Sequence, residues 1–405
     1  KEDFIKRKKA GDPRLKGKTR ILVFDNKGTG PCRQGQYYEM HKLLLKKQFG
    51  GGANKNSSLA PAGQTLEHQI KLLVGHEKDG FNIGLPEWAL IQSFQGVILQ
   101  GVLHSVLLKA GAACRDYGAY REFYEDYLKL KNQVYETLEK KIKPSPTRLK
   151  LAKQIGEKSL IAGAIFKYFG YGLYRNNGLR VVLKTFAKKW IARKPEDRPN
   201  QIKIHLEGEA YMRVAQVQEV FNSLVDAIGF GSFKATYSPL WCYLELLLEF
   251  ARLECQEAVD LSKNPREIKE KKKLTAKIKK VIKILRLVLA GPLYRAARVA
   301  MPEPMSQVLD YSRQILPSLK PHGELPPYIG EAILKIKAGT DLFLNIAPEG
   351  CMVSSMAQLF SQPILKLSGR RARIQDLFTL NGEVNEEQLR TALLKTLGPE
   401  RYYRK

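Results

Sequence analysis

Apolar segments in the second half of this chain alternate between the spacing of a strand and the spacing of a helix. The predicted strands are residues 201–206, 234–237, 341–346 and 374–380. The predicted helices that follow the first two strands cover residues 217–228 and 240–253. Strands that alternate with helices in this way predict a parallel sheet with helices on both faces.

The N-terminal part of the chain adds a further strand, loop and helix. Residues 20–24 form a buried-strand pattern, a glycine-bearing loop follows, and a helix is predicted over 37–47. From residue 86 to about 194 the pattern is helical, and residues 194–199, with two prolines and no apolar side chain, are the best candidate for a linker. We therefore expect an α/β protein of two Rossmann-like lobes, their parallel sheets covered by helices, with a helical insertion between them. The expected boundaries are 1–85 for the first lobe, incomplete at its N-terminus, 86–195 for the helical segment, and 200–405 for the second lobe.

Two of the five cysteines lie in glycine-bearing turns. Cys32 lies in residues 30–37, and Cys351 lies in residues 348–352, directly after a predicted strand. Ligands of open parallel sheets bind beyond the carboxyl ends of the strands, so thiolates on such loops can converge there although they are distant in sequence. Two converging thiolates favour a soft metal, above all an iron–sulfur cluster.

The alternative is that the cysteines are small buried apolar residues. Cys242 and Cys255 lie on one apolar helical pattern and are predicted to be core, whereas Cys114 ends an apolar stretch and fits either interpretation. No CxxC spacing occurs, so a zinc ribbon, a thioredoxin-type pair and a ferredoxin-type run have no support. The odd, sparse cysteine count also argues against a secreted disulfide scaffold.

The chain is strongly basic, with 68 Lys and Arg against 40 Asp and Glu and a net charge of +28. Such a charge attracts polyanions, whether nucleic acid, an anionic membrane surface, or the phosphates of a nucleotide or of coenzyme A. The lysines are dispersed, which is also typical of a solvated surface. In residues 266–289 an apolar stripe lies opposite a lysine-rich face, a pattern shared by membrane-surface helices, calmodulin targets and helices packed on a sheet.

Motifs of several enzyme classes are missing. The six histidines form no HExxH or i,i+4 pair, and no Gly-x-Ser-x-Gly segment occurs, so hydrolase and zinc-protease functions have no support. Gly17-Lys18-Thr19 has the wrong upstream glycine spacing for a phosphate-binding loop. The longest apolar stretch, 88–108, contains three glutamines and a histidine, so we predict a core helix or helix pair and no membrane span.

Three segments, in order along the chain, carry a resemblance to one family. They are Gly-Pro-Cys-Arg-Gln-Gly-Gln-Tyr at 30–37, Gly-Glu-Ala-Tyr-Met-Arg at 208–213, and the stretch from Gly-Glu-Ala-Ile-Leu to Pro-Glu-Gly-Cys-Met at 330–352. Together they resemble the 2-hydroxyacyl-CoA dehydratase and benzoyl-CoA reductase superfamily, in particular the activase-related, dehydratase-like region of large acyl-CoA dehydratase activators. The resemblance covers nearly the whole chain and is loosest between residues 110 and 200.

The resemblance implies a cysteine-ligated iron–sulfur cluster, of the [4Fe-4S] or the double-cubane type. Cys32 and Cys351 match ligand cysteines of the family. The neighbouring motif residues implied to contact the cluster are Gly30, Arg33, Gly35 and Gly350. A further family ligand precedes the first motif and matches no residue here; because the chain begins in a charged stretch at Lys1, we expect it to be a piece of a longer protein that holds this ligand upstream. Gln34 and Val353-Ser354 depart from the family pattern and alter the loops around the cluster.

Members of this family receive low-potential electrons from an ATP-hydrolysing activator component or domain and reduce an acyl-CoA or another small molecule. The resemblance therefore implies that this chain is the cluster-binding component of an ATP-activated 2-hydroxyacyl-CoA dehydratase or acyl-CoA reductase-like system, with lyase or oxidoreductase chemistry. It also implies a homo- or heterodimer in an anaerobic cytoplasm. One alternative is a cluster-free protein that binds nucleic acid or another polyanion through its charge; another is a subunit kept for assembly, with vestigial cysteines.

Overall fold

The computed structural model describes residues 2–16, 21–27, 34–45, 47, 70–76, 87–139, 178–191, 201–209, 212–320, 323–380 and 383–399. The chain divides into two compact units, residues 1–89 and residues 90–405. The predicted linker at 194–199 lies outside the described residues.

The first unit contains a pair of parallel strands. Strand β1 (Ile21–Lys27) pairs with β2 (Ile70–His76), and Ile21 lies opposite Ile70. Helix α2 (Gln34–Leu45) follows β1 and lies against it. The helix α1 (Glu2–Lys9) and a short 3₁₀ turn (Pro13–Leu15) precede these elements. The strand and the helix form where the sequence predicted them, whereas β2 was not predicted.

The second unit is built on a five-stranded sheet with the strand order β4-β3-β5-β6-β7. Its strands are β3 (Ile202–Gly208), β4 (Phe233–Tyr237), β5 (Leu342–Pro348), β6 (Arg373–Leu380) and β7 (Glu383–Val384). The first four are parallel and β7 is antiparallel to β6. The chain passes from β3 to β4 on one side and then returns to add β5 on the other side, so the topological switch point lies between β3 and β5.

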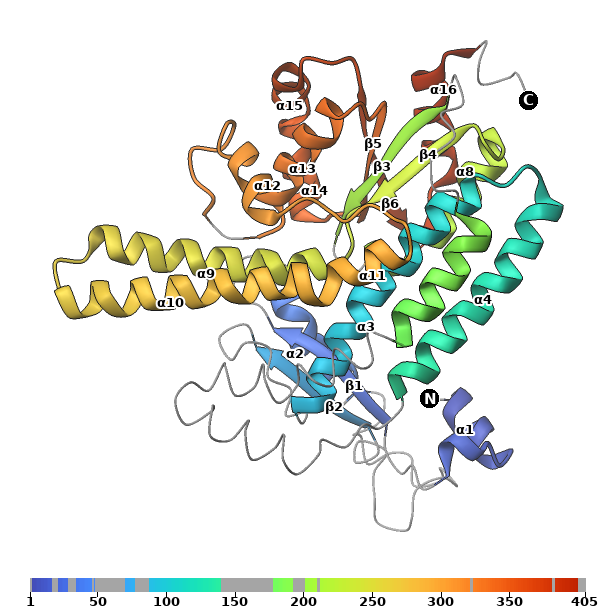
Figure 1. Cartoon of the computed structure of the whole chain (residues 1–405), viewed down its shortest axis with the longest axis horizontal. Helices are drawn as coiled ribbons and strands as arrows, with labels where there is room; N and C mark the ends of the chain where they lie inside the picture. The colour runs from blue at the N-terminus through green and yellow to red at the C-terminus, as the bar shows by residue number, and fades with distance from the viewer. Residues whose placement is uncertain are drawn as a thin grey trace. The chain divides into compact units, whose positions relative to one another are not determined.

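Helices cover both faces of this sheet, as the alternating pattern predicted (Figure 1). One face packs on α8 (Val217–Ile228) and α16 (Glu386–Leu397). The other packs on α13 (Leu325–Lys337), α14 (Met352–Leu359) and α15 (Ser361–Ser368). The remaining shorter helices of this part of the unit are α7 (Met212–Ala215), α11 (Gly291–Ala296) and α12 (Met305–Ser312).

Alternation along β3 determines which side chains meet each layer. Ile202, Ile204 and Leu206 join the large core that contains α8 and α16. His205 and Glu207 point to the opposite face, because successive strand residues alternate between faces. His205 stacks on Phe343 of β5, which belongs to the core beneath α13, with ring centroids 5.2 Å apart. Two polar side chains are thus placed inside an apolar layer.

Helix α3 (Glu87–Val106) continues into a π-helical turn (Leu107–Gly111), so the 88–108 stretch forms one long helix. It packs in the main core with α4 (Tyr117–Glu139) and with the helix at residues 178–190. No helix in the described part of the chain is long and apolar enough to cross a membrane.

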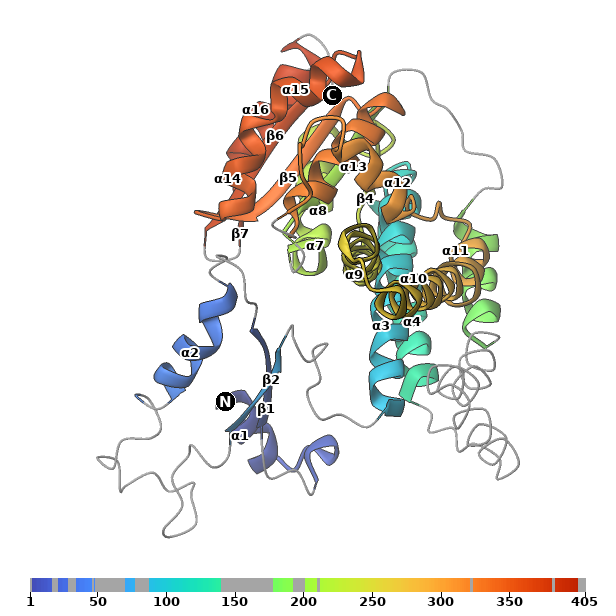
Figure 2. The same cartoon turned by 90° about the vertical axis from the view of Figure 1, so that its left-hand side faces the viewer.

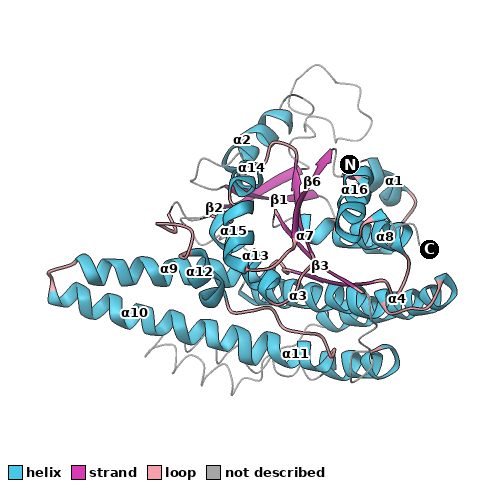
Figure 3. Cartoon of the chain, turned by 90° about the horizontal axis from the view of Figure 1, so that it is seen from above, coloured by secondary structure: helices cyan, strands magenta, loops and turns pink. Residues whose placement is uncertain are grey.

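Helices α9 (Trp241–Leu261) and α10 (Pro265–Ile284) form a long antiparallel hairpin that extends away from the sheet in Figure 1 and Figure 3. Figure 2 shows the two helices end-on, side by side. Asn264 caps α10 by accepting a hydrogen bond from the Arg266 amide, and Pro265 begins the helix. The apolar stripe of α10 packs on α9 through Ile278, Ile282 and Cys255, so the partner of this stripe is a helix and not a sheet.

The expectation of two sheet-bearing lobes is met only in part by the described residues. A covered sheet is present in the second unit, whereas the first unit contributes the β1–β2 pair alone. The protein is therefore an α/β protein, mostly helical, with one five-stranded and mostly parallel sheet.

Candidate functional site

Cys351 lies at the carboxyl end of β5, beside the switch point of the sheet. The turn before it contains Gly350 with φ +72°, and Cys351 itself is the residue that precedes α14. Its thiol donates a hydrogen bond to Glu209, which follows β3, with Sγ 3.2 Å from Oε2. The loops after the two strands that flank the switch point are therefore joined by this contact.

The environment of the Cys351 thiol raises its pKa to about 11. Burial is the largest cause, and the negative charge of Glu209 adds to it. The backbone amide and the hydroxyl of Ser354, in the first turn of α14, act in the opposite direction and lower the pKa. The free thiol is consequently protonated at neutral pH and becomes a ligand only when a metal ion displaces its proton.

The other predicted site residues divide between described and undescribed parts of the chain. Gly350 is in the turn just named, and Gly35 lies in the first turn of α2. Cys32, Gly30 and Arg33 lie outside the described residues. Whether Cys32 approaches Cys351 therefore stays a prediction.

Three further cysteines are buried in helices or at their ends. Cys242 and Cys255 lie on α9, as predicted for core residues. Cys114, for which the sequence left two interpretations, is also buried, and its thiol donates to the Ala110 carbonyl at 3.5 Å. These three and Cys351 are free thiols.

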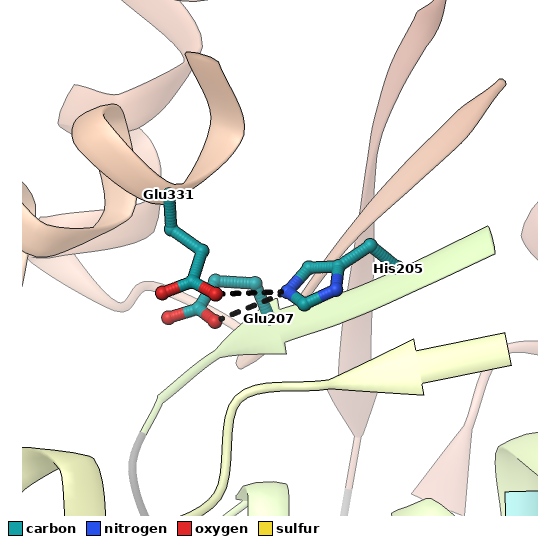
Figure 4. A group of neighbouring side chains, drawn as sticks. All are labelled: His205, Glu207 and Glu331. Atoms are coloured by element: carbon teal, nitrogen blue, oxygen red, sulfur yellow. Dashed lines mark ion pairs between the residues drawn. The ribbon is translucent and has the colours of Figure 1, made fainter. Parts of the chain in front are cut away.

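A buried cluster of His205, Glu207 and Glu331 lies beneath α13, near the carboxyl end of β3 (Figure 4). The exposed fractions of these residues are 0%, 2% and 3%. His205 Nε2 lies 3.8 Å from Glu207 Oε2 and 3.7 Å from Glu331 Oε1. Figure 4 shows the imidazole of β3 and the two carboxylates pointing toward one another. These distances are too long for hydrogen bonds, so the three groups surround a common point without closing on it.

Each member of the cluster also has a partner outside the cluster. Arg213 donates to the Gly208 carbonyl through Nε, and its Nη2 lies 2.5 Å from Glu207 Oε1. Lys335 Nζ lies 3.7 Å from Glu331 Oε1 and 2.5 Å from Glu303 Oε2. His205 Nδ1 lies 2.8 Å from the Thr236 hydroxyl on β4. The geometry of the cluster is thus determined by β3, β4 and α13 together.

Burial dominates the protonation of the cluster. It lowers the pKa of His205 to about 3, with the charge of Lys335 as the next cause. Burial also raises the pKa of Glu207, against the opposing charge of Arg213. The pKa of Glu331 is raised by burial and then by the charge of Glu207. The imidazole is therefore neutral at physiological pH, and its ring nitrogen is able to act as a ligand.

A polar row continues from Glu207 across the sheet. Glu207 pairs in register with Asn345 of β5, which pairs with Asp376 of β6. Asn345 Nδ2 donates to Asp376 Oδ1 at 2.6 Å, and Ser354 Oγ lies 3.4 Å from Asn345 Oδ1. This row connects the buried cluster with Ser354 in the first turn of α14, the helix that Cys351 precedes.

Comparisons with protein-family models, with curated proteins and with solved structures found no match for this chain.

The histidine spacings of the sequence do not indicate the His205–Glu207–Glu331 cluster. His205 lies in the predicted strand 201–206 and Glu207 directly follows that strand, whereas β3 extends to Gly208. Period two places both side chains on one face, and that face is buried under α13. One feature of the sequence could have indicated this pair. Strands of a parallel sheet are buried on both faces, so two ionisable residues at alternate positions of such a strand are unusual. Glu331 lies 124 positions further on, in a helix, and the fold was needed to bring it there.

Proposed function

We propose that this chain is the iron–sulfur cluster-binding component of an ATP-activated 2-hydroxyacyl-CoA dehydratase or acyl-CoA reductase-like system in an anaerobic cytoplasm. In this proposal Cys351, together with Cys32, binds a [4Fe-4S] or double-cubane cluster, which accepts low-potential electrons from an ATP-hydrolysing partner. The reduced cluster then transfers electrons to an acyl-CoA or a similar small substrate.

The observation that carries the proposal is the position of Cys351 at the switch point between β3 and β5. Ligands of open α/β sheets bind beyond the carboxyl ends of the strands at this point. The thiol is only partly buried, and the polar hydrogens of Ser354 face its sulfur. Hydrogen bonds to sulfur are among the features that determine the potential of an iron–sulfur cluster.

The parallel pair β1–β2 supports a further part of the proposal. Parallel strands need a crossover connection, and residues 28–69 provide one of sufficient length, with α2 inside it. We infer that the first unit belongs to a second Rossmann-like lobe, which supplies Cys32 from the loop after β1.

The test is anaerobic reconstitution of the full chain with ferrous iron and sulfide, followed by measurement of acid-labile sulfide and iron per chain. We expect the chain to bind both and Cys351→Ala to lose the sulfide. Cys255→Ala is the matched control, because this thiol is buried between α9 and α10, away from the strand ends. Equal sulfide in Cys351→Ala and in the unmodified chain, or no sulfide in either, would contradict the proposal.

A second candidate function, polyanion binding, is supported by α10. This helix carries nine basic and two acidic side chains, a net charge of +7. Seven of its eight lysines are exposed. Because phosphate contacts release counterions, binding to a polyanion through this face would weaken steeply with salt.

The polyanion hypothesis is tested by fluorescence anisotropy with a single-stranded oligonucleotide at low and moderate salt. Replacing Lys272, Lys273 and Lys277 by Gln should then weaken binding strongly. A control triple variant of Lys184, Lys188 and Lys366 removes the same charge from exposed positions elsewhere. Equal losses in both variants would show that net charge alone acts and that α10 is no binding surface.

A further inference from the structure

We propose that His205, Glu207 and Glu331 bind one divalent transition-metal ion, through Nε2 of the imidazole and one oxygen of each carboxylate. The three atoms lie within 4.8 Å of one another, and all three residues are almost completely buried. The site is separate from the proposed cluster at Cys351 and does not depend on it.

The geometry accommodates an ion with little movement. With Nε2 at 3.8 Å and 3.7 Å from the two oxygens, and all three atoms within 4.8 Å, one point lies about 2.0 to 2.4 Å from each of them. Nitrogen and oxygen ligands of Zn²⁺ lie at about 2.0 to 2.2 Å, so a shift of a few tenths of an ångström completes the coordination.

Two carboxylate oxygens without a hydrogen bond face the same point. Glu207 Oε2 and Glu331 Oε1 are buried and accept no hydrogen bond, and these are the two oxygens that face His205. Glu331 Oε1 has a cation nearby, Lys335 Nζ at 3.7 Å. The hydroxyl of Tyr328, one turn before Glu331 on α13, is also buried without a partner. Burial is the largest cause that raises the pKa of Tyr328, and the charges of Asp376 and Glu207 add to it. A buried carboxylate oxygen without a partner is costly, and a bound cation removes that cost.

The charge of the surroundings favours a dication. The carboxylates that act on Arg213 and Lys335 are those of Glu207, Glu303, Glu324 and Glu331. With His205 neutral, four carboxylates face two cations, so the fully ionised cluster has a net charge of −2. One divalent ion balances this charge.

The supporting contacts resemble the outer shell of known metal sites. When His205 Nδ1–H donates to Thr236, the lone pair of Nε2 points at the two carboxylates. Arg213 holds Glu207 by its other oxygen, Oε1, and leaves Oε2 available. One imidazole with two carboxylates suits Mn²⁺, Fe²⁺ or Zn²⁺, with water or the nearby Ser238 hydroxyl at further positions.

The experiment uses Mn²⁺, because thiolates favour softer ions and would not compete for it. The full chain is stripped with a chelator, refolded with and without Mn²⁺, desalted, and measured for bound manganese and for its unfolding midpoint. We expect one Mn²⁺ per chain, a higher midpoint with Mn²⁺, and ¹⁴N coupling from imidazole in the pulsed electron paramagnetic resonance spectrum. Zn²⁺ should compete for the same site, and Mg²⁺ should not.

Variants decide between a metal site and a buried ion-pair network. Glu331→Gln keeps the shape and should weaken Mn²⁺ binding by about tenfold to a hundredfold or more, and His205→Gln should also abolish the nitrogen coupling. Glu249→Gln alters another buried carboxylate, bonded to Arg252, and should bind Mn²⁺ normally. Cys351→Ala should also bind normally, which separates this site from the proposed cluster. The proposal is overturned if the unmodified chain retains neither Mn²⁺ nor Zn²⁺, or if Glu331→Gln retains Mn²⁺ equally well.

Discussion

The thiol of Cys351 and the carboxylate of Glu209 are joined by a hydrogen bond of 3.2 Å across the switch point of the sheet. Glu209 follows β3 and Cys351 follows β5, so the contact connects the two loops that diverge there. The backbone beneath is equally close, because the Glu209 amide donates to the Ile346 carbonyl at 3.0 Å. The thiol makes this hydrogen bond only while it carries its proton, because the Glu209 carboxylate can only accept.

Glu209→Gln should make Cys351 more reactive toward alkylating reagents. Removing the negative charge lowers the pKa of the thiol from about 11, and the reactive form is the thiolate. We expect an alkylation rate at pH 8 that is several-fold higher, up to about tenfold, because each unit of pKa changes the thiolate fraction about tenfold. The rate is measured by mass spectrometry on the Cys351 peptide of the metal-free chain. Cys114, whose pKa burial also raises to about 11, is the internal control and should not change.

Gly208→Ala should strongly destabilise the sheet. Gly208 has φ +136°, and a Cβ at this position would overlap the carbonyl of Ile346 on the neighbouring strand. We expect a loss of about 3 kcal/mol or more in the free energy of unfolding, since both strain and overlap act. Gly229→Ala has a positive φ of +77° but no atom within 4 Å of the added Cβ, so it should cost about 1 kcal/mol. Urea unfolding of both variants measures the difference, and equal losses would contradict the close approach of β3 to β5.

The sequence predicted the parallel sheet because its strands and helices have distinct periods. Helix α8 has the predicted bounds, and β3 to β6 begin within a residue of their predicted positions. Apolar patterning does not determine which elements pack together. For this reason the apolar stripe of α10 is compatible with packing on a sheet, on a membrane surface or on calmodulin. Strand β2 was missed because residues 70–76 stand alone, and their pairing with β1 depends on a contact almost fifty residues away.

The two candidate sites also differ in how far the sequence could predict them. Cys351 could be predicted because a glycine turn after an apolar strand is a local pattern, and the sheet places such turns at one edge. The His205–Glu207–Glu331 cluster could not, because a helix 124 residues later supplies its third member. Burial under α13, which leaves one oxygen of each carboxylate without a hydrogen bond, is a property of packing and not of spacing.

Arg286→Met should cost far more stability than the loss of an exposed ion pair. Arg286 Nη1 lies 2.6 Å from the buried Glu245 Oε2, and Glu245 also accepts from the Met305 amide. Removing the arginine leaves a buried carboxylate without its cation, for which we expect a loss of about 3 to 5 kcal/mol. Lys320→Met breaks a half-exposed pair with Glu257 and should cost less than about 1 kcal/mol. Urea unfolding tests both, and adding Glu245→Gln to Arg286→Met should recover part of the loss.

His104 should make the fold less stable as the pH falls from 6.5 toward 4. Its ring is largely covered on α3 and packs against Tyr237, and this burial, followed by the charge of Lys131, lowers its pKa to about 4. The unfolded chain binds a proton at His104 near pH 6.5 while the folded chain does not, so the free energy of unfolding decreases through this range by up to about 3 kcal/mol. His104→Gln removes this proton-binding site. Urea unfolding at several pH values between 4 and 7 should therefore show a smaller pH dependence in the variant than in the unmodified chain. Other groups titrate in the same window, and the difference between the two chains isolates His104; parallel curves would mean that this imidazole is protonated equally in both states.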